Sequence, residues 1–476
     1  MSKPGISFLS QEELNDIHSA SVKILEKTGI KVMSHKALDI LKKAGAKVDY
    51  EANHATIPGA LVGEALKRVP KTITYGARNS ENDFVLDKQT PHFTTTGMPA
   101  FVLDGETGER RSSVTADLAC FTRIADYLKN VHSVWPMIVT TDVPGPLQCL
   151  MEFITIARNT TKHLEHEALT ALDAQYQVEI ATAIVGSKEQ LKKKPINSAV
   201  QCVFSPLTYE KGLIEGSIEY GKAGVPVVVM PMPLAGTTGP VTPAGTMALN
   251  NAEFLGNLVI LELANPGAPV LYSPGVGVSN FKTGYHRWAP EASLMHLGLT
   301  QLARYYELPS EVGVMGGGSK LLDAQAGYQK AISIIAALLM TPDIALGVGG
   351  LGGCISAETL IIDNEIIDYA LRYLLGLEID DETLAVDVID KVGPGGNFLG
   401  EKHTLQYFRE GWVPEISDMD TFEVWQRKGS KAIAEVAKEK TKEILATHKV
   451  APLPEDVEKE IARVLKRAEA EFLKAS

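Results

Sequence analysis

Between about residues 91 and 376, short apolar runs alternate with longer segments whose apolar residues recur at helical spacing. The runs are nearly continuous in apolar residues, which is typical of parallel strands buried on both faces. The sequence therefore predicts a parallel sheet with helices on its faces. The eight predicted strands are 92–96, 132–140, 163–169, 197–203, 226–232, 269–275, 311–317 and 344–350.

Eight segments long enough for helices accompany these runs. Eight strands alternating with eight helices predict an α/β protein with a (β/α)8 TIM barrel, because closing the sheet is the economical arrangement for that count. An open doubly wound sheet is the alternative. The predicted helices are 116–129, 148–159, 173–188, 209–223, 246–264, 289–306, 323–341 and 355–374.

Two extensions flank the predicted barrel (91–376). Residues 1–90 predict an N-terminal helical and α+β extension. It opens with a helix over 10–28, where Ser10 and Glu13 have the spacing of a capping box. Residues 377–476 contain no strand pattern and predict a C-terminal helical extension packed on the barrel.

Turn residues and runs of charged residues predict further elements in and next to these extensions. Pro58 suits a helix start, and the turn residues in AFVLDGETGERRSS predict a hairpin just inside the barrel region. The C-terminal extension contains a predicted loop at 393–400. Two strongly charged helices are predicted after this loop, near 421–447 and 454–474. Their charge runs are typical of solvated helix faces, and docking of a partner is the alternative.

Composition narrows the class of protein. The chain has 46 basic and 58 acidic residues, a net charge of −12, which argues against nucleic acid or an anionic membrane as partner. Its four cysteines form no CxxC pair, so neither a zinc knuckle nor a disulfide framework is indicated. No signal peptide and no spanning segment is visible, and we expect a cytoplasmic protein.

The predicted loops after the fifth to eighth strands are rich in glycine, as in MGGGSKLLDAQAG and GGLGGCISAE. In a barrel, chemistry is located at these C-terminal strand ends. None of the loops matches a P-loop, and Val276-Gly277 does not open a dinucleotide fingerprint. Glycine at these positions instead indicates room for a large, flat ligand.

Aromatic residues fall at or just beyond the predicted strand ends. Aromatic faces stabilise a quaternary ammonium by roughly 0.5–2 kcal/mol each, although each residue could simply pack a helix on the sheet. In Tyr285-His286-Arg287-Trp288 a guanidinium next to aromatics suits the carboxylate of a betaine, and a plain surface arginine is the alternative. The aromatic set is Phe93, Trp135, Tyr272, Tyr285 and Trp288.

His163 and His166 are three residues apart on a predicted strand. Residues at that spacing point to opposite faces, so they cannot chelate one ion, and we expect no bound metal. We expect a histidine near the barrel mouth that positions substrate, and a buried core histidine is the alternative.

The chain resembles the trimethylamine methyltransferase family over essentially its whole length. Several long segments in the same order are far more specific than any short motif. The resemblance implies a TIM barrel and transfer of a methyl group from an amine to a corrinoid. The telling stretches are NTTKHLEH (159–166), PVTPAGTMALNNAEFL (240–255), DAQAGYQK (323–330), ETLIIDNEI (358–366) and ETLAVDVIDKVGPGGNFL (382–399).

Two departures concern the substrate. The resemblance implies a pyrrolysine at the end of the seventh strand in members that act on trimethylamine, and here Gly316 matches that position. A glutamate near the end of the eighth strand is matched by Gly350. The chain therefore resembles the non-pyrrolysine quaternary amine:corrinoid methyltransferases. Glycine betaine is the first candidate substrate, and proline betaine, carnitine or γ-butyrobetaine are alternatives.

The corrinoid is expected on a separate protein. Corrinoid carriers hold cobalt with a D-x-H-x-x-G loop, and Asp16-Ile17-His18 lacks the glycine. We expect a cognate corrinoid protein to present cob(I)alamin at the barrel mouth, where Gly316, Gly317 and Gly350 would leave room for the corrin.

The predicted site needs no acid, base or nucleophile, because a quaternary ammonium expels a neutral tertiary amine. We also expect a homo-oligomer. A non-catalytic barrel that binds a quaternary amine, a trimethylamine methyltransferase and a metal- or phosphate-dependent barrel enzyme are the alternatives. The expected substrate-binding residues are Trp135, His163, His166, Tyr272, Tyr285, His286, Arg287, Trp288 and Gln325.

Overall fold

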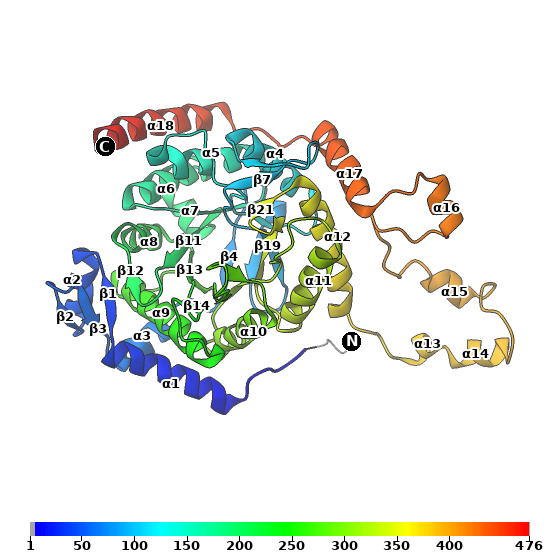
Figure 1. Ribbon diagram of the computed structural model, residues 1–476, viewed down its shortest axis with the longest axis horizontal. Helices are drawn as coiled ribbons and strands as arrows, with labels where there is room; N and C mark the ends of the chain where they lie inside the picture. Colours follow the sequence, from blue (N-terminus) through cyan, green and yellow to red (C-terminus); the bar gives the residue numbers. More distant parts are fainter. Residues whose placement is uncertain (1–4, 476) are drawn as a thin grey trace.

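A computed structural model describes residues 5–475, and its centre is a sheet of eight parallel strands curled into a barrel (Figure 1). The strands follow one another around the barrel in chain order, and a parallel bridge between Tyr272 and Ser310 joins the sixth strand to the seventh. The predicted (β/α)8 barrel is confirmed. Its strands are β6 (His92–Thr95), β9 (Ser133–Val134), β10 (His163–Glu167), β11 (Asn197–Val203), β13 (Val227–Pro231), β15 (Val270–Tyr272), β18 (Glu311–Gly313) and β19 (Ile344–Val348).

Helices surround this barrel, one after each strand (Figure 1). Their ends carry ordinary caps: the Thr170 side chain accepts from the Asp173 N–H at the start of α6, and Gly186 ends that helix with a left-handed φ of 94°. Among residues 5–475, no helix combines the length and the apolar character that crossing a membrane needs. The helices are α4 (Thr115–Tyr127), α5 (Gln148–Asn159), α6 (Ala171–Val185), α8 (Lys211–Ala223), α9 (Pro243–Ala264), α10 (Pro290–Tyr305), α11 (Ala324–Leu339) and α12 (Ala357–Leu374), with α7 (Lys188–Lys193) before β11.

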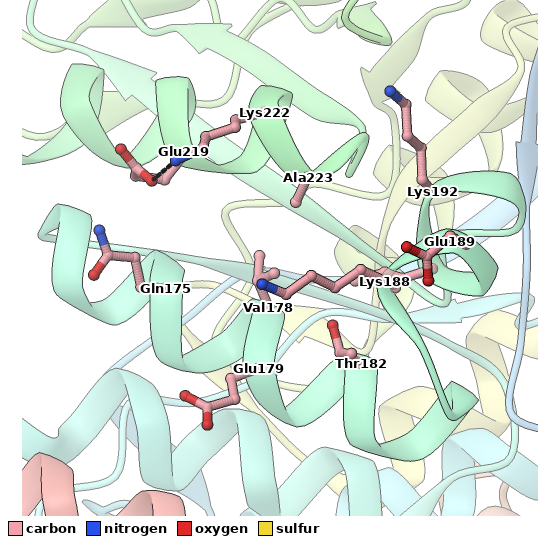
Figure 2. A pocket seen from close by; sticks show the side chains of 11 residues that line it. Gln175, Val178, Glu179, Thr182, Lys188, Glu189, Lys192, Glu219, Lys222 and Ala223 are labelled. Carbon is pink, nitrogen blue, oxygen red and sulfur yellow. Dashed lines mark ion pairs between the residues drawn. The ribbon is translucent and has the colours of Figure 1, made fainter.

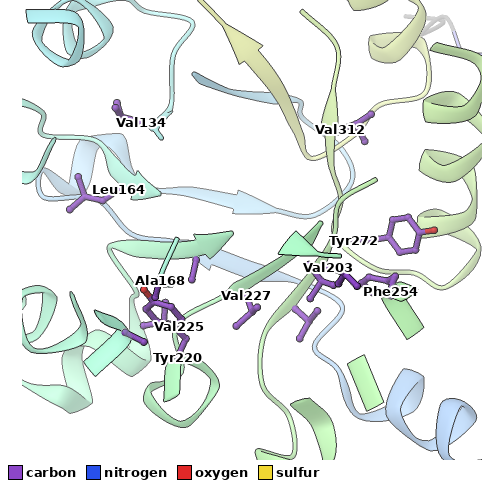
Figure 3. Close-up of a cluster of buried hydrophobic side chains, with 14 of the residues drawn as sticks. Val134, Leu164, Ala168, Val203, Tyr220, Val225, Val227, Phe254, Tyr272 and Val312 are labelled. Carbon is purple, nitrogen blue, oxygen red and sulfur yellow. The ribbon is translucent and has the colours of Figure 1, made fainter. Parts of the chain in front are cut away.

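Two groups of buried side chains stabilise the barrel, because successive residues of a strand point alternately outward and inward. Outward residues such as Val227 pack between the sheet and the helices (Figure 3). Inward residues such as Val200, Val228, Leu271 and Ile344 pack around the barrel axis. This alternation decides which predicted site residues can reach the inside of the barrel.

A hairpin, β4 (Ile73–Tyr75) and β5 (Phe84–Leu86), packs into the N-terminal end of the barrel. Tyr75 stacks on His163 with ring centroids 3.9 Å apart. The predicted helix at 10–28 is confirmed, with the Ser10–Glu13 capping box present. This helix is α1 (Gln11–Lys27), and the strands that follow it form one small sheet with β12 (Thr208–Tyr209). The other elements of the N-terminal extension are β1 (Ile30–Val32), α2 (His35–Lys43), β2 (Lys47–Asp49), β3 (His54–Thr56) and α3 (Gly59–Arg68).

Small sheets lie in the loops that follow the strands. The predicted hairpin is confirmed as β7 (Phe101–Leu103) paired with β8 (Arg110–Ser112). It joins β20 (Gly350–Leu351) and β21 (Cys354–Ile355) in one sheet.

The C-terminal region differs from the prediction. The helix expected at 421–447 is two helices, α16 (Phe422–Arg427) and α17 (Ile433–Thr447), because Gly429 and Ser430 have left-handed φ values of 100° and 55°. α17 packs on α12 and α4, and α18 (Glu455–Ala475) packs on α6. The residues between α12 and α17 do not follow the barrel but extend sideways from it (Figure 1). They include α13 (Asp381–Leu384), α14 (Val386–Val392) and α15 (Lys402–Tyr407).

Candidate active site

The C-terminal ends of the eight strands form the mouth of the barrel. Part of the loop after β15 forms a hairpin of β16 (Gly277–Ser279) and β17 (His286–Arg287), which joins β14 (Leu234–Ala235), from the loop after β13, in a small sheet. We call residues 277–289 the mouth hairpin. It carries four of the residues predicted for the site.

Trp288 of the mouth hairpin lies directly on the backbone that follows the seventh strand. A Cβ atom at Gly316 would lie 1.8 Å from Cζ3 of this ring, and one at Gly318 would lie 3.1 Å from its Cδ1. No side chain fits at Gly316 unless the indole moves. The His286 ring also packs on Trp288, with centroids 4.6 Å apart.

The glycines expected to leave room for a corrin are packed against side chains of this chain. A Cβ at Gly317 would lie 3.1 Å from the Gln329 Oε1, and one at Gly350 3.1 Å from the Thr96 Oγ1. The Gly318 N–H donates to Gln329 at 2.9 Å, and the predicted residue Gln325 lies next to Gln329. The glycines therefore make room for Trp288, Gln329 and Thr96, and their contact with a corrin stays a prediction.

Trp135 follows the second strand and packs among the inward side chains. A Cβ at Gly97 would lie 2.5 Å from the Trp135 ring, so the Trp135 ring, like that of Trp288, packs directly on the backbone of a glycine. The buried Nε1–H of Trp135 has no acceptor among the described residues. Because buried donors are nearly always satisfied, this N–H indicates a place for a ligand or a water.

His286 and Arg287 cannot hold one carboxylate together, contrary to our expectation. They are consecutive residues of β17 and therefore point to opposite faces. His286 is partly buried against Trp288 and Gly277, and burial lowers its pKa. Arg287 is exposed and lies 3.7 Å from the Glu291 carboxylate.

Tyr272 and Phe93 point outward, into the layer between strands and helices. The Tyr272 ring packs on Phe254 with centroids 4.3 Å apart (Figure 3), and its hydroxyl bonds Asn251 at 3.2 Å. Phe93 is fully buried in the same outer cluster. These aromatics pack helices on the sheet, the alternative reading of their sequence positions, and Tyr272 does not reach the mouth.

His163 and His166 do point to opposite faces, but neither lies at the mouth. His163 begins β10 and therefore lies at the N-terminal end, where its Nδ1 bonds the Gly76 carbonyl at 2.7 Å. Burial lowers its pKa to about 3. His166 points outward, with its Nε2 3.4 Å from the Glu152 carboxylate.

A pair of buried carboxyls lies beside His163 at this closed end. Glu165 and Glu311 face each other across the barrel axis, and among the described residues no other donor reaches the Glu311 oxygens. Burial raises the pKa of Glu165 to about 7 and that of Glu311 well above its ordinary value. One carboxyl therefore keeps its proton at neutral pH and donates it to the other.

Three residues at the mouth were missed in the sequence. Glu167 ends β10, and its register with Val200 places it on the inward face; burial raises its pKa. Ser273 follows β15, is buried, and its hydroxyl has no partner among the described residues. His296 of α10 is partly buried beside Gly313, and desolvation lowers its pKa to about 4. Period-two counting from the inward Glu165 would have found Glu167.

Exposed apolar side chains gather in the loops around the mouth. They come from the loops after four different strands, so they surround the opening rather than forming a single patch. Because the loops at this end of a (β/α)8 barrel carry its binding residues, these side chains are candidates for contact with a partner or ligand. We call them the rim: Phe204, Met232, Phe281, Tyr285, Trp288 and Leu321.

The described residues offer no alternative to the mouth as the active site, either as a metal site or as a groove elsewhere on the barrel. Among residues 5–475 there is no group of three or more His, Cys, Asp or Glu side chains able to hold a metal. A groove of about 610 Å³ lies outside the barrel, between α6, α7 and α8 (Figure 2). Its charged side chains, such as Glu179, Lys188 and Lys222, belong to helices of the outer layer, away from the strand ends.

The closed barrel and its mouth, lined by aromatic rings and buried polar groups, define a (β/α)8-barrel enzyme. Residues 2–472 match the family described as trimethylamine methyltransferase. The chain belongs to this family and is a methyltransferase.

Named relatives agree with this assignment. The trimethylamine methyltransferase of Desulfitobacterium hafniense strain DCB-2 is 31% identical over 98% of this chain and 95% of its own length. The glycine betaine methyltransferase of Desulfitobacterium hafniense strain Y51 is 32% identical over 89% of each chain. The crystal structure of the Methanosarcina barkeri monomethylamine methyltransferase shares the fold, with a TM-score of 0.52 and 12% identity over 98% of this chain and 88% of that chain.

Proposed function

We propose that this enzyme moves a methyl group from a quaternary amine to the Co(I) corrinoid of a separate corrinoid protein and releases the tertiary amine. Glycine betaine is the first candidate substrate, with proline betaine, carnitine and γ-butyrobetaine as alternatives. The names of the relatives support methylated amines as the substrate class. One relative is named for trimethylamine, a tertiary amine, and another for glycine betaine, a quaternary amine.

The packing of Trp288 on Gly316 carries the choice of a quaternary amine. The family resemblance places the pyrrolysine of trimethylamine enzymes at this position, and here the first atom of any side chain would overlap the indole. No long electrophilic group can project from residue 316. A tertiary amine is a poor leaving group without such help, whereas a quaternary ammonium leaves as a neutral amine.

The inward residues of the mouth suit a betaine. Trp135 and Trp288 offer aromatic faces to the ammonium, each worth roughly 0.5–2 kcal/mol. Glu167 adds a carboxylate, which a bound cation would favour over its neutral form. The unpartnered Ser273 hydroxyl and a ring nitrogen of His286 are available to the substrate carboxylate.

The protein's part in the reaction is positioning. The C–N bond breaks, its electron pair stays on nitrogen, and the methyl carbon bonds to the acceptor. When bound, the reduced corrinoid supplies the nucleophilic cobalt that accepts the methyl group. The mouth holds one methyl group outward and excludes water, which is worth several kcal/mol when the geometry is correct. Because positive charge is lost during the reaction, too tight a cage would favour substrate over transition state.

The rim supports the proposed corrinoid partner. Its exposed side chains are apolar or aromatic, as the face of a corrin and the edge of its carrier require. Phe281 and Trp288 of the mouth hairpin would lie against the corrin, and the more peripheral Phe204 and Leu321 against the carrier.

The test is spectroscopic. The purified enzyme is mixed with cob(I)alamin and each amine in turn, and methylcobalamin formation is followed by absorbance. We expect methylation with a betaine and none with trimethylamine. Methylation with trimethylamine alone would overturn the choice of a quaternary amine. Betaine binding by calorimetry without any methyl transfer would instead indicate a non-catalytic binding barrel.

A further inference from the structure

Residues 377–411, here called the arm, leave the barrel after α12 and extend away from it (Figure 1). The arm contains α13, α14 and α15, which have four to seven residues each, and none of its residues is buried. Helices this short are not stable alone in water. The arm therefore needs packing partners that its own chain does not provide.

The exposed side chains of the arm are strongly apolar. Leu399 is 82% exposed, Leu405 72% and Phe408 58%. Single exposed apolar residues are ordinary, but a segment that exposes this many is typical of an interface. The large apolar residues exposed on the arm are Leu377, Ile379, Leu384, Val386, Ile389, Phe398, Leu399, Leu405 and Phe408.

The total surface of the chain points to the same conclusion. The chain exposes 21652 Å². A compact monomer of 51.4 kDa is expected to expose about 17,300 Å², so the surplus is about 4,300 Å². Obligate homodimer interfaces bury about 2,000–5,000 Å² in total, which is about 1,000–2,500 Å² on each chain. The surplus of this one chain exceeds that share, so it is large enough for a permanent interface.

A matching apolar face lies beside the root of the arm. Tyr328 and Ile332 form an exposed i,i+4 pair on α11, and Tyr369 and Tyr373 form another on the neighbouring helix α12. A groove of about 450 Å³ opens between α12 and Trp412. The outer faces of α11 and α12, with this groove, are here called the receptor face.

We propose that the arm of one chain packs on the receptor face of a second copy, which returns its own arm to the first. Arm and receptor face are adjacent on one chain, so a two-fold exchange covers both surfaces on both copies. The occupant is a second copy, because the surplus surface of one chain is large enough for a permanent interface. A partner that leaves cannot keep this much apolar surface permanently covered.

The test compares masses in solution. Sedimentation velocity of the full chain alone, without any corrinoid protein, should give at least twice the 51.4 kDa chain mass. The double variant Leu405→Glu, Phe408→Glu should sediment as a single chain. The matched control is Val85→Glu, which adds a charge at an exposed apolar residue outside the arm and should keep the assembly. A single-chain mass for the wild type, or an unchanged assembly in the double variant, would overturn the proposal.

A second measurement covers the case in which the double variant does not fold. Hydrogen exchange of wild-type residues 398–411 should be slow in the assembly, because the contacts of the second copy protect the short helix α15. Exchange at the rate of an unstructured peptide would overturn the exchange of arms. The oligomer and the proposed methyl transfer can fail independently, because the first measurements use neither amine nor corrinoid.

Discussion

The two ends of the barrel contain similar residue types in opposite situations. At the N-terminal end, the Tyr75 ring covers His163, and the carboxyls of Glu165 and Glu311 face each other. The His163 Nε2 and the Tyr75 hydroxyl at this closed end have no partner among the described residues. At the mouth, Trp135 and Ser273 also have buried polar atoms without partners in the part of the chain that the structure describes. The comparison teaches that a buried polar atom without a partner indicates a binding site only at the end of the barrel that is open. The residues that stabilise the fold and the residues that bind a substrate thus lie at opposite ends of the same strands.

The largest expected effect comes from filling the space under Trp288. Gly316→Leu forces the indole away, because the first atom of the new side chain would lie 1.8 Å from the ring. A displacement of about 1 Å in a positioning group can slow a reaction about 100-fold. We expect that loss in the rate of methylcobalamin formation. Gly327→Ala is the control, since its Cβ meets nothing within 4 Å. Full activity in Gly316→Leu would remove the main support for the proposed site.

The carboxyl pair at the closed end should act on stability alone. Burial raises the pKa of Glu165 from 4.5 to about 7 and that of Glu311 well above 4.5. The folded state therefore holds protons that the unfolded state releases, so stability is greatest below about pH 4.5 and falls as the pH rises through 7. The shift of Glu165 corresponds to about 3 kcal/mol.

Glu311→Gln should remove the part of this pH dependence that Glu311 contributes, because an amide does not titrate; the part due to the burial of Glu165 should remain. Urea unfolding of both proteins at pH 5 and pH 8 measures the effect, and methyl transfer at pH 7 should not change. Equal pH dependence in the two proteins would show that Glu311 does not carry a raised pKa in the folded protein. A large loss of activity would show that the two ends are not separate.

Substitutions of Trp135, which points inward, and Tyr272, which points outward, test whether only inward aromatic residues bind the substrate. Trp135→Leu should raise the KM for glycine betaine about 2- to 30-fold, the equivalent of a lost cation–π contact of 0.5–2 kcal/mol. Tyr272→Phe is the matched control. It removes only a hydroxyl bonded to Asn251 in the outer layer, so stability should fall by about 1 kcal/mol with no change in KM. A larger KM effect in Tyr272→Phe than in Trp135→Leu would reverse the two assignments.

The barrel could be predicted from sequence because its strands are continuous apolar runs between amphipathic helices. The same continuity hides which face each residue occupies. In PVLYSPG both faces are apolar, so Tyr272 looked as suitable for the mouth as Trp135, and a register shift of one residue separates them. The position along the strand was decisive for His163, which begins its strand and so lies at the closed end.

Contacts between distant loops could not be predicted. Trp288 and Gly316 belong to the loops after different strands, and no local pattern shows that one ring fills the space beside the other. The arm was equally hidden, because its short helices lack the long amphipathic period that identifies helices packed on a barrel.

The smallest expected effect concerns Arg287, which the sequence favoured as the carboxylate anchor. On β17 it points away from His286 and lies near Glu291 on the exposed face. Exposed ion pairs of this kind contribute about 0–1 kcal/mol, so Arg287→Ala should change neither stability nor the KM for glycine betaine appreciably. His286→Ala, on the partly buried face, should raise that KM by more. A KM that rises only in Arg287→Ala would mean that the mouth hairpin presents its other face when substrate binds, and the carboxylate anchor would then pass from His286 to Arg287.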